Sequence, residues 1–125
     1  MKPTTNPVVF FEIPAIDLER AKTFYKAVFN VSFEDASIDG NEMSFFSFDS
    51  ELKGISGALA KGETYKPTKE GVIIYFHSND IDETLEKVTQ QNGTTFYPKT
   101  SVGSMGFVAE FIDSEGNRIA IHQNI

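Results

Sequence analysis

Two residues of this 125-residue chain could exchange a proton with a bound ligand, Glu12 and His122. Glu12 lies within an apolar segment, where a carboxylate is costly to bury unless it is paired or faces a wet cavity. Imidazoles exchange protons near neutral pH, and a carboxylate can orient them. We therefore interpret Glu12 and His122 as a candidate metal-free catalytic acid–base pair. Alternatively, the two residues could bind a polar ligand without catalysing a reaction. Glu12 could also form an internal ion pair or hydrogen bond, or lie at a solvated edge. His77 is interpreted as structural or solvated.

Apolar and aromatic residues could line a ligand pocket beside this pair. Side chains alternate along a strand, so Phe10 shares a face with Glu12, and Ala120 shares one with His122. Tyr75 occupies the place of Glu12 in the second half of the chain. The predicted substrate-binding residues are Phe10, Phe46, Phe48, Val72, Tyr75, Met105, Phe107 and Ala120. The Phe and Met side chains among them could equally fill a core.

These residues belong to a unit that the chain contains twice. Residues 6–34 and 70–98 each read as an apolar strand, an acidic helix start, an amphipathic helix and a short strand. Asp17 and Asp80 are the predicted N-caps of the two helices. The strands are predicted at Val8–Ile13, Val31–Ala36, Met43–Phe48, Ile55–Ala60, Val72–Phe76, Thr94–Tyr97, Phe107–Ile112 and Arg118–His122. The predicted class is α+β, in the order βαβββ twice.

The repeat predicts how the chain is organised. We expect one domain, residues 1–125, with a first module at 6–60 and a second at 71–125. The polar linker between them, 61–70, contains Pro67. Asn92-Gly93 is predicted to end the second helix, and 113–117 to form a hairpin turn. A chain of this length can bury a single core.

Composition limits the partners. The formal charge of −7 argues against nucleic acid, which requires clustered Lys and Arg to neutralise phosphates. No apolar stretch has the length of a membrane span or a signal peptide. The absence of cysteine excludes disulfides and thiolate chemistry, so a reducing cytoplasm is the expected location.

Three stretches resemble the vicinal oxygen chelate (VOC) superfamily, which includes lactoylglutathione lyase (glyoxalase), bleomycin-resistance proteins and extradiol dioxygenases. They are FEIPAIDLERAKTFYKAVF at 11–29, DIDETLEKVTQQNG at 80–93 and GFVAEFIDSEGNRIAIH at 106–122. The resemblance implies two βαβββ modules whose sheets curl into an open, cup-shaped mixed β-barrel. It also implies a homodimer, the commonest oligomer of such proteins.

Metal-dependent members of this superfamily hold a divalent ion with four side chains, two from each half. Such an ion needs His, Glu or Gln donors. The matching positions here are Val9 or Phe10, Val72 or Ile73, Ala120, and one position within Glu42 to Asp49. At least three of these four positions carry no donor atom. We therefore expect no metal and no other cofactor.

Three functions are compatible with these observations. The first is a glyoxalase-like VOC-domain protein that binds a small molecule in the cup without a metal, as bleomycin-resistance members do. The apolar residues at the metal positions and the negative charge favour it. The second is an enzyme, a lyase or isomerase related to lactoylglutathione lyase, which acts on a small carbonyl compound through Glu12 and His122. The third is a scaffold whose own Phe side chains fill the pocket.

Overall fold

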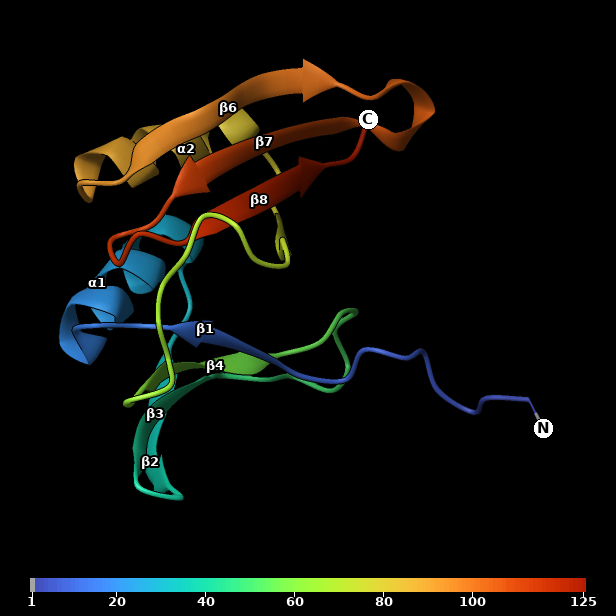
Figure 1. Cartoon of the computed structure of the whole chain (residues 1–125). Coiled ribbons are helices and arrows are strands. Elements are labelled where there is room, and N and C mark those ends of the chain that lie inside the picture. The colour runs from blue at the N-terminus through green and yellow to red at the C-terminus, as the bar shows by residue number, and fades with distance from the viewer. Residues whose placement is uncertain (1) are drawn as a thin grey trace.

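The computed structural model describes residues 2–125, and the repeated order of elements is visible in it (Figure 1). The elements are β1 (Phe11–Pro14), α1 (Leu18–Phe29), β2 (Phe33–Ile38), β3 (Asn41–Phe46), β4 (Gly57–Lys61), β5 (Tyr75–His77), α2 (Ile81–Gln90), β6 (Thr94–Ser101), the short 3-10 helix η1 (Gly103–Met105), β7 (Phe107–Ile112) and β8 (Arg118–Gln123). The predicted α+β class and the double βαβββ order are confirmed.

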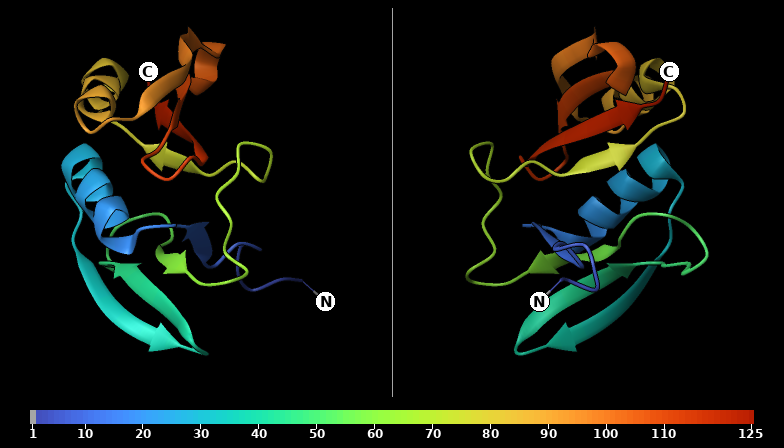
Figure 2. Two further views of the ribbon diagram at one scale, coloured as in Figure 1. Left: turned by 60° about the vertical axis from the view of Figure 1, so that its left-hand side comes forward. Right: turned by 90° about the vertical axis from the view of Figure 1, so that its right-hand side faces the viewer.

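The strands form two four-stranded mixed sheets. The first sheet has the order β1-β4-β3-β2 and the second has the order β5-β8-β7-β6. In each sheet the first strand pairs in parallel with the last, and the other pairs are antiparallel. Within residues 2–125 no strand pairing joins the two sheets, so they do not close into a barrel. Both helices lie on one side of the sheets (Figure 2, left).

The caps predicted for the two helices are present. The Asp17 carboxylate accepts a hydrogen bond from the Arg20 amide at 3.0 Å, and Asp80 accepts one from the Glu83 amide at 3.2 Å. The second helix ends at Gln90, and Gly93 follows where the chain has no room for a side chain. A Cβ there would lie 2.7 Å from Val88 Cγ1 and 2.8 Å from the Ile112 carbonyl oxygen.

The predicted first strand is too long. Val8 and Val9 precede β1 and are 61% and 69% exposed, because the chain offers them no partner. β1 pairs with β4, and β4 begins only at Gly57, opposite Phe11. The first strand of the second half likewise spans Tyr75–His77 rather than Val72–Phe76, and Val72 is 93% exposed.

The hairpin between β2 and β3 is tighter than predicted. Asp39 and Gly40 both have positive φ, 53° and 77°, as a two-residue hairpin turn of type I′ requires. This short turn extends the pairing from Ile38–Asn41 back to Phe33–Phe46. The strands therefore lie at 33–38 and 41–46 instead of 31–36 and 43–48.

Aromatic rings join the two halves in one core between helices and sheets. Phe29 of α1 stacks on Phe76 of β5 with ring centroids 4.5 Å apart. Phe46 of β3 lies 6.0 Å from Phe76 and 5.7 Å from Tyr25. Phe46 is buried, so this predicted pocket residue belongs mainly to the core. Contacts between aromatic rings have preferred geometries, and they stabilise the core beyond what the burial of apolar area contributes.

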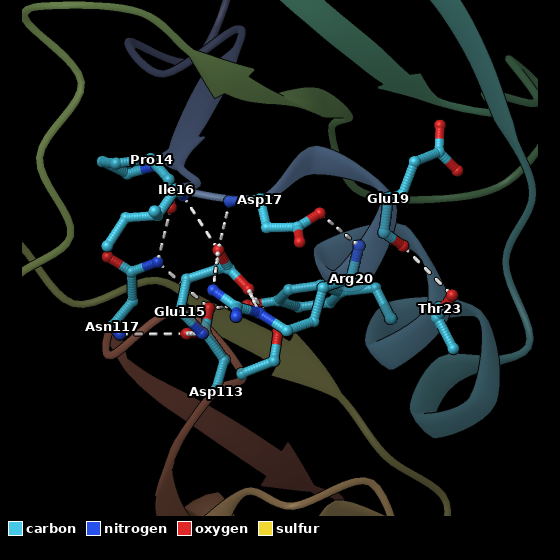
Figure 3. Close-up of polar contacts among 11 residues, drawn as sticks. Pro14, Ile16, Asp17, Glu19, Arg20, Thr23, Asp113, Glu115 and Asn117 are labelled. Atoms are coloured by element: carbon cyan, nitrogen blue, oxygen red, sulfur yellow. Dashed lines mark hydrogen bonds and ion pairs between the residues drawn. The ribbon is translucent and has the colours of Figure 1, made fainter.

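A buried carboxylate in the turn between β7 and β8 connects the halves (Figure 3). The Glu115 side chain is 0% exposed. It accepts hydrogen bonds at 2.8 Å from the backbone amides of both Ile16 and Asp17. The Arg20 guanidinium donates to both of its oxygens, at 2.8 and 3.1 Å. A residue of the second half thus holds the start of the first helix.

Asp113 and Asn117 complete this turn. Asp113 accepts hydrogen bonds from the Tyr25 hydroxyl at 2.6 Å and from the amides of Glu115 and Asn117 at 2.9 Å. The Asn117 amide group donates to the Pro14 carbonyl at 2.8 Å. Among the described residues, no buried side-chain polar atom lacks a partner. The motif read as a hairpin turn is therefore also the polar joint between the halves.

The two carboxylates respond differently to burial. Burial alone would raise the pKa of Glu115, but hydrogen bonds from Arg20, Asp17, Ser114 and Ile16 outweigh it, and the pKa is lowered. For Asp113 burial dominates, and its pKa is raised despite the hydrogen bonds that it accepts. Glu115 therefore stabilises the fold as an anion.

Replacing Glu115→Gln should lower the free energy of unfolding at neutral pH by about 2 kcal/mol, because the amide cannot match the charged hydrogen bonds. A carboxylate with a lowered pKa stabilises the fold above its unfolded pKa, and this contribution is lost as pH falls through the folded value. The difference between wild type and variant should shrink at acid pH, as measured by urea unfolding. Glu63→Gln, in the exposed linker, is the control. A difference that is constant with pH would contradict the assignment.

Candidate functional site

Each sheet has one face toward the helices and one face away from them. Alternation along the paired strands places Glu12, Ala58 and Phe45 side by side on the outer face of the first sheet. The corresponding row of the second sheet is Tyr75, Ala120 and Glu110. The repeat has therefore produced two equivalent faces with different chemistry.

The outer face of the second sheet carries a hollow of about 560 Å³. We call it the histidine hollow, and its lining is Tyr75, Phe76, His77, Val102, Met105, Val108 and His122. Its walls are mostly apolar, and polar groups come only from Tyr75 and the two histidines. An apolar cavity of this size with a few convergent polar groups is typical of small-molecule sites.

The two histidines lie next to each other. His77 and His122 are directly paired in the parallel ladder between β5 and β8, so their side chains leave the sheet on the same face. His122 Nε2 hydrogen-bonds the Met105 carbonyl oxygen, and His77 Nε2 hydrogen-bonds the Asn79 side-chain oxygen at 3.0 Å. Both partners are acceptors, so each Nε2 donates its proton. Nδ1 of each ring is then unprotonated, and no hydrogen bond within residues 2–125 involves it.

The predicted pair of Glu12 and His122 is not brought into contact. Glu12 lies on the first sheet and accepts a hydrogen bond from the Tyr65 hydroxyl at 2.9 Å. It lines a separate depression of about 220 Å³, whereas His122 lines the histidine hollow on the second sheet. His77 takes the place beside His122 instead. The neighbourhood of His77 and His122 is visible only from the strand pairing. The sequence alone shows that His77 and Tyr75, two residues apart, share one face of their strand.

The predicted lining residues are divided among several places. Tyr75 and Met105 line the histidine hollow. Phe10, Phe46 and Phe48 line a hollow on the first sheet, and Val72 lines the depression beside Glu12. Ala120 is buried within β8, and Phe107 packs against the core with the Lys99 ammonium 4.9 Å from its ring centre.

The positions at which the resemblance leads us to expect metal ligands can be located on the paired strands. Glu12 pairs with Ala58 as Tyr75 pairs with Ala120, so the repeat makes Ala58 the counterpart of Ala120. This moves the position expected within Glu42 to Asp49 onto β4. Glu42 itself forms an ion pair with Lys61, with 3.8 Å between Glu42 Oε2 and Lys61 Nζ. The resulting set is Phe10, Ala58, Ile73 and Ala120. Residues 2–125 also contain no cluster of three His, Asp or Glu suited to a metal. This donor set does not fit a divalent ion.

The outer face of the first sheet is covered by the chain itself. Tyr65, from the segment between β4 and β5, packs on a small cluster of Met43, Ala58 and Ala60. Its hydrogen bond to Glu12 and its partial burial raise the pKa of the Tyr65 hydroxyl. The two small alanines leave room for the ring. The first sheet therefore offers no equivalent of the histidine hollow at this place.

Comparison with known proteins gives one consistent family. Residues 8–121 match the sequence profile of the Glyoxalase/Bleomycin resistance protein/Dioxygenase superfamily. A glyoxylase-like domain-containing protein of Didymella fabae is 32% identical over 114 residues, which is 88% of each chain.

In the part of the chain that the structure describes, neither helix is long and apolar enough to cross a membrane.

Solved structures support the same fold. A glyoxylase/bleomycin resistance protein/dioxygenase domain from Frankia superposes with a TM-score of 0.75 at 13% identity, over 98% of this chain and all (100%) of that one. A glyoxalase I variant from Zea mays gives a TM-score of 0.69 at 15% identity over 94% of this chain. The chain spans only 46% of that maize protein. At these identities the likeness shows the fold alone.

Removing the Tyr65 ring should destabilise the fold more than removing its hydroxyl. Tyr65→Phe loses one partly exposed hydrogen bond, at a cost of about 1 kcal/mol or less. Tyr65→Ala uncovers Ala58, Ala60 and Met43, at a cost of about 2 kcal/mol. Denaturant unfolding measures both, and Tyr97→Ala, an exposed tyrosine of β6, is the control. If Tyr65→Ala costs no more than Tyr97→Ala, the ring does not hold the linker on the sheet.

Proposed function

Because the chain belongs to the glyoxalase/bleomycin resistance protein/dioxygenase (VOC) superfamily, we propose that it binds a small molecule in the histidine hollow, with no divalent ion at the superfamily's usual positions. The observation that carries this proposal is the pairing of His77 with His122 inside an otherwise apolar hollow. The residues Phe10, Ala58, Ile73 and Ala120 support the part that concerns the metal, since none of their side chains can coordinate.

The hollow suits a ligand with an apolar body and a polar end. Val102, Met105 and Val108 provide apolar surface, and burying the ligand there supplies most of the affinity. The two Nδ1 atoms and the Tyr75 hydroxyl provide the polar contacts that fix its orientation. Both imidazole rings are already oriented by hydrogen bonds to protein oxygens, so little order has to be gained on binding.

An alternative proposal is a lyase or isomerase that acts on a small carbonyl compound. It is supported by the same two imidazoles, because a free Nδ1 can take a proton from the carbon beside a carbonyl. Tyr75 lines the same hollow, and in this version its hydroxyl would donate to the developing enolate oxygen. The proton would then return from the imidazole to the neighbouring carbon. Glu12 takes no part in this version, because Tyr65 holds it on the first sheet.

Assembly and location complete the proposal. A homodimer is expected from the resemblance to two-module members of the superfamily and from the frequency of twofold assemblies. A cytoplasmic location is supported by the absence of cysteine in the sequence. Neither enters the argument for the histidine hollow.

Ligands from a small-molecule fragment set should shift the backbone NMR signals of residues 75–77, 102–108 and 120–123. For the best binder, His77→Ala and His122→Ala should each weaken affinity about tenfold, because each removes a polar contact inside an apolar hollow. Thr23→Ala, on the exposed face of α1, should leave the affinity unchanged. Binders that shift only first-sheet signals, or that ignore both His variants, would overturn the proposal.

The same variants separate the two proposed functions. Turnover of a small carbonyl compound that is lost in His122→Ala, while Thr23→Ala retains it, would establish the lyase or isomerase. If the wild type binds the compound but does not turn it over, the first proposal, a binding protein, is favoured. Turnover that is unchanged in both His variants would remove the imidazoles as the base.

Purified protein should contain well below one equivalent of zinc, nickel, iron or manganese per chain. Metal analysis before and after dialysis against a chelator measures this, and ligand affinity should be the same in both samples. A stoichiometric ion whose removal abolishes binding would contradict the metal-free assignment.

A further inference from the structure

A second hollow, lined only by residues of the first half, is not used by the function proposed above. It has a volume of about 490 Å³ and lies on the first sheet. We call it the phenylalanine hollow, and its lining is Val9, Phe10, Glu34, Phe45, Phe46, Ser47, Phe48, Ser56 and Gly57. The segment before β1 and the loop between β3 and β4 lie at the same end of this sheet (Figure 1), and both contribute residues to the lining.

Four phenylalanines line the hollow, and all of them except Phe46 are at least partly exposed. The rings of Phe10 and Phe45 lie 6.1 Å apart at an angle of 42°. Phe10 is 45% exposed and Phe48 is 61% exposed, so both present apolar surface to a ligand. The ring faces carry partial negative charge, so they attract a cation placed over them.

Glu34 provides the one charged group in this lining. It lies on β2 directly opposite Phe45 of β3, so its side chain shares the face with that ring. No Lys, Arg or His lines the hollow. Among the ion pairs of residues 2–125, none involves Glu34. A carboxylate next to aromatic rings is thus available for an external positive charge.

The walls of the hollow are anchored to the sheet. The Ser47 amide donates to the Ser32 carbonyl at 2.9 Å, and the two hydroxyls lie 2.6 Å apart, which fixes the chain just before Phe48. Phe11, next to Phe10, packs its ring 5.6 Å from Phe46 in the core. Gly57 allows β4 to approach β1, since a Cβ there would lie 2.0 Å from the Phe11 carbonyl oxygen. A binding site with fixed walls loses little entropy when it is filled.

We propose that the phenylalanine hollow binds a small organic cation, a quaternary ammonium or a protonated amine. The rings of Phe10, Phe45 and Phe48 would contact its methyl or methylene groups, and the Glu34 carboxylate would balance its charge. The net charge of −7 favours the approach of cations over anions. This site is separate from the histidine hollow, so either proposal can fail without the other.

Choline and its neutral isostere 3,3-dimethylbutan-1-ol test this inference, because they differ in charge but hardly in shape. NMR titration of the whole chain should show choline shifting the signals of Glu34, Phe45 and Phe48, with the neutral alcohol binding more weakly. Glu34→Gln and Phe48→Leu should each weaken choline binding about three- to tenfold. Added salt should weaken it further in the wild type.

Matched controls keep the outcome clear. Glu63→Gln removes the same charge from the linker, and Phe96→Leu removes an exposed ring of β6, and neither should alter choline binding. Equal affinity for choline and the alcohol, or equal affinity in wild type and Glu34→Gln, would overturn the proposal. A third result would also overturn it: neither probe binds, and sedimentation shows a dimer that Phe48→Leu dissociates. A second copy of the chain would then cover the rings of the phenylalanine hollow.

Discussion

The buried carboxylate of Glu115 is the constraint on which the arrangement of the two halves depends. It comes from the turn between β7 and β8 and accepts the amides of Ile16 and Asp17 and the guanidinium of Arg20. Without it, two amides at the start of α1 would lose the acceptor that they share. Because the donors and the acceptor belong to different halves, satisfying them sets how one sheet lies relative to the other.

Around this joint, the aromatic core fills the space between helices and sheets. Tyr25 connects the two, since its ring packs on Phe46 and Phe76 while its hydroxyl donates to Asp113. The polar joint alone would hold the halves by a few directional bonds, and the rings add apolar area on both sides of it. Most of the buried apolar residues lie in this core between helices and sheets, which leaves the outer face of the second sheet free to carry ligand chemistry.

The duplicated scaffold has diverged on those outer faces. The second sheet has His77 and His122 where the first has Pro14 and Ala60, and Tyr65 covers the first sheet at that place. The result is one hollow with imidazoles and a second, near the other end of the first sheet, with phenyl rings and a carboxylate. Two sites of different charge preference can therefore arise from one repeated unit.

The sequence by itself determined the class, the βαβββ repeat, both helix caps and the superfamily, because these depend on local periodicity, short-range hydrogen bonds and motif residues. Only the tertiary structure decided which residues meet. It placed His77 beside His122, because contact across a sheet depends on strand register, and a change of register by one residue turns each side chain to the other face. It also placed Glu12 beside Tyr65, because the segment between β4 and β5 folds over the first sheet. The extent of β1 was also decided this way, since an apolar segment becomes a strand only where a partner strand runs beside it.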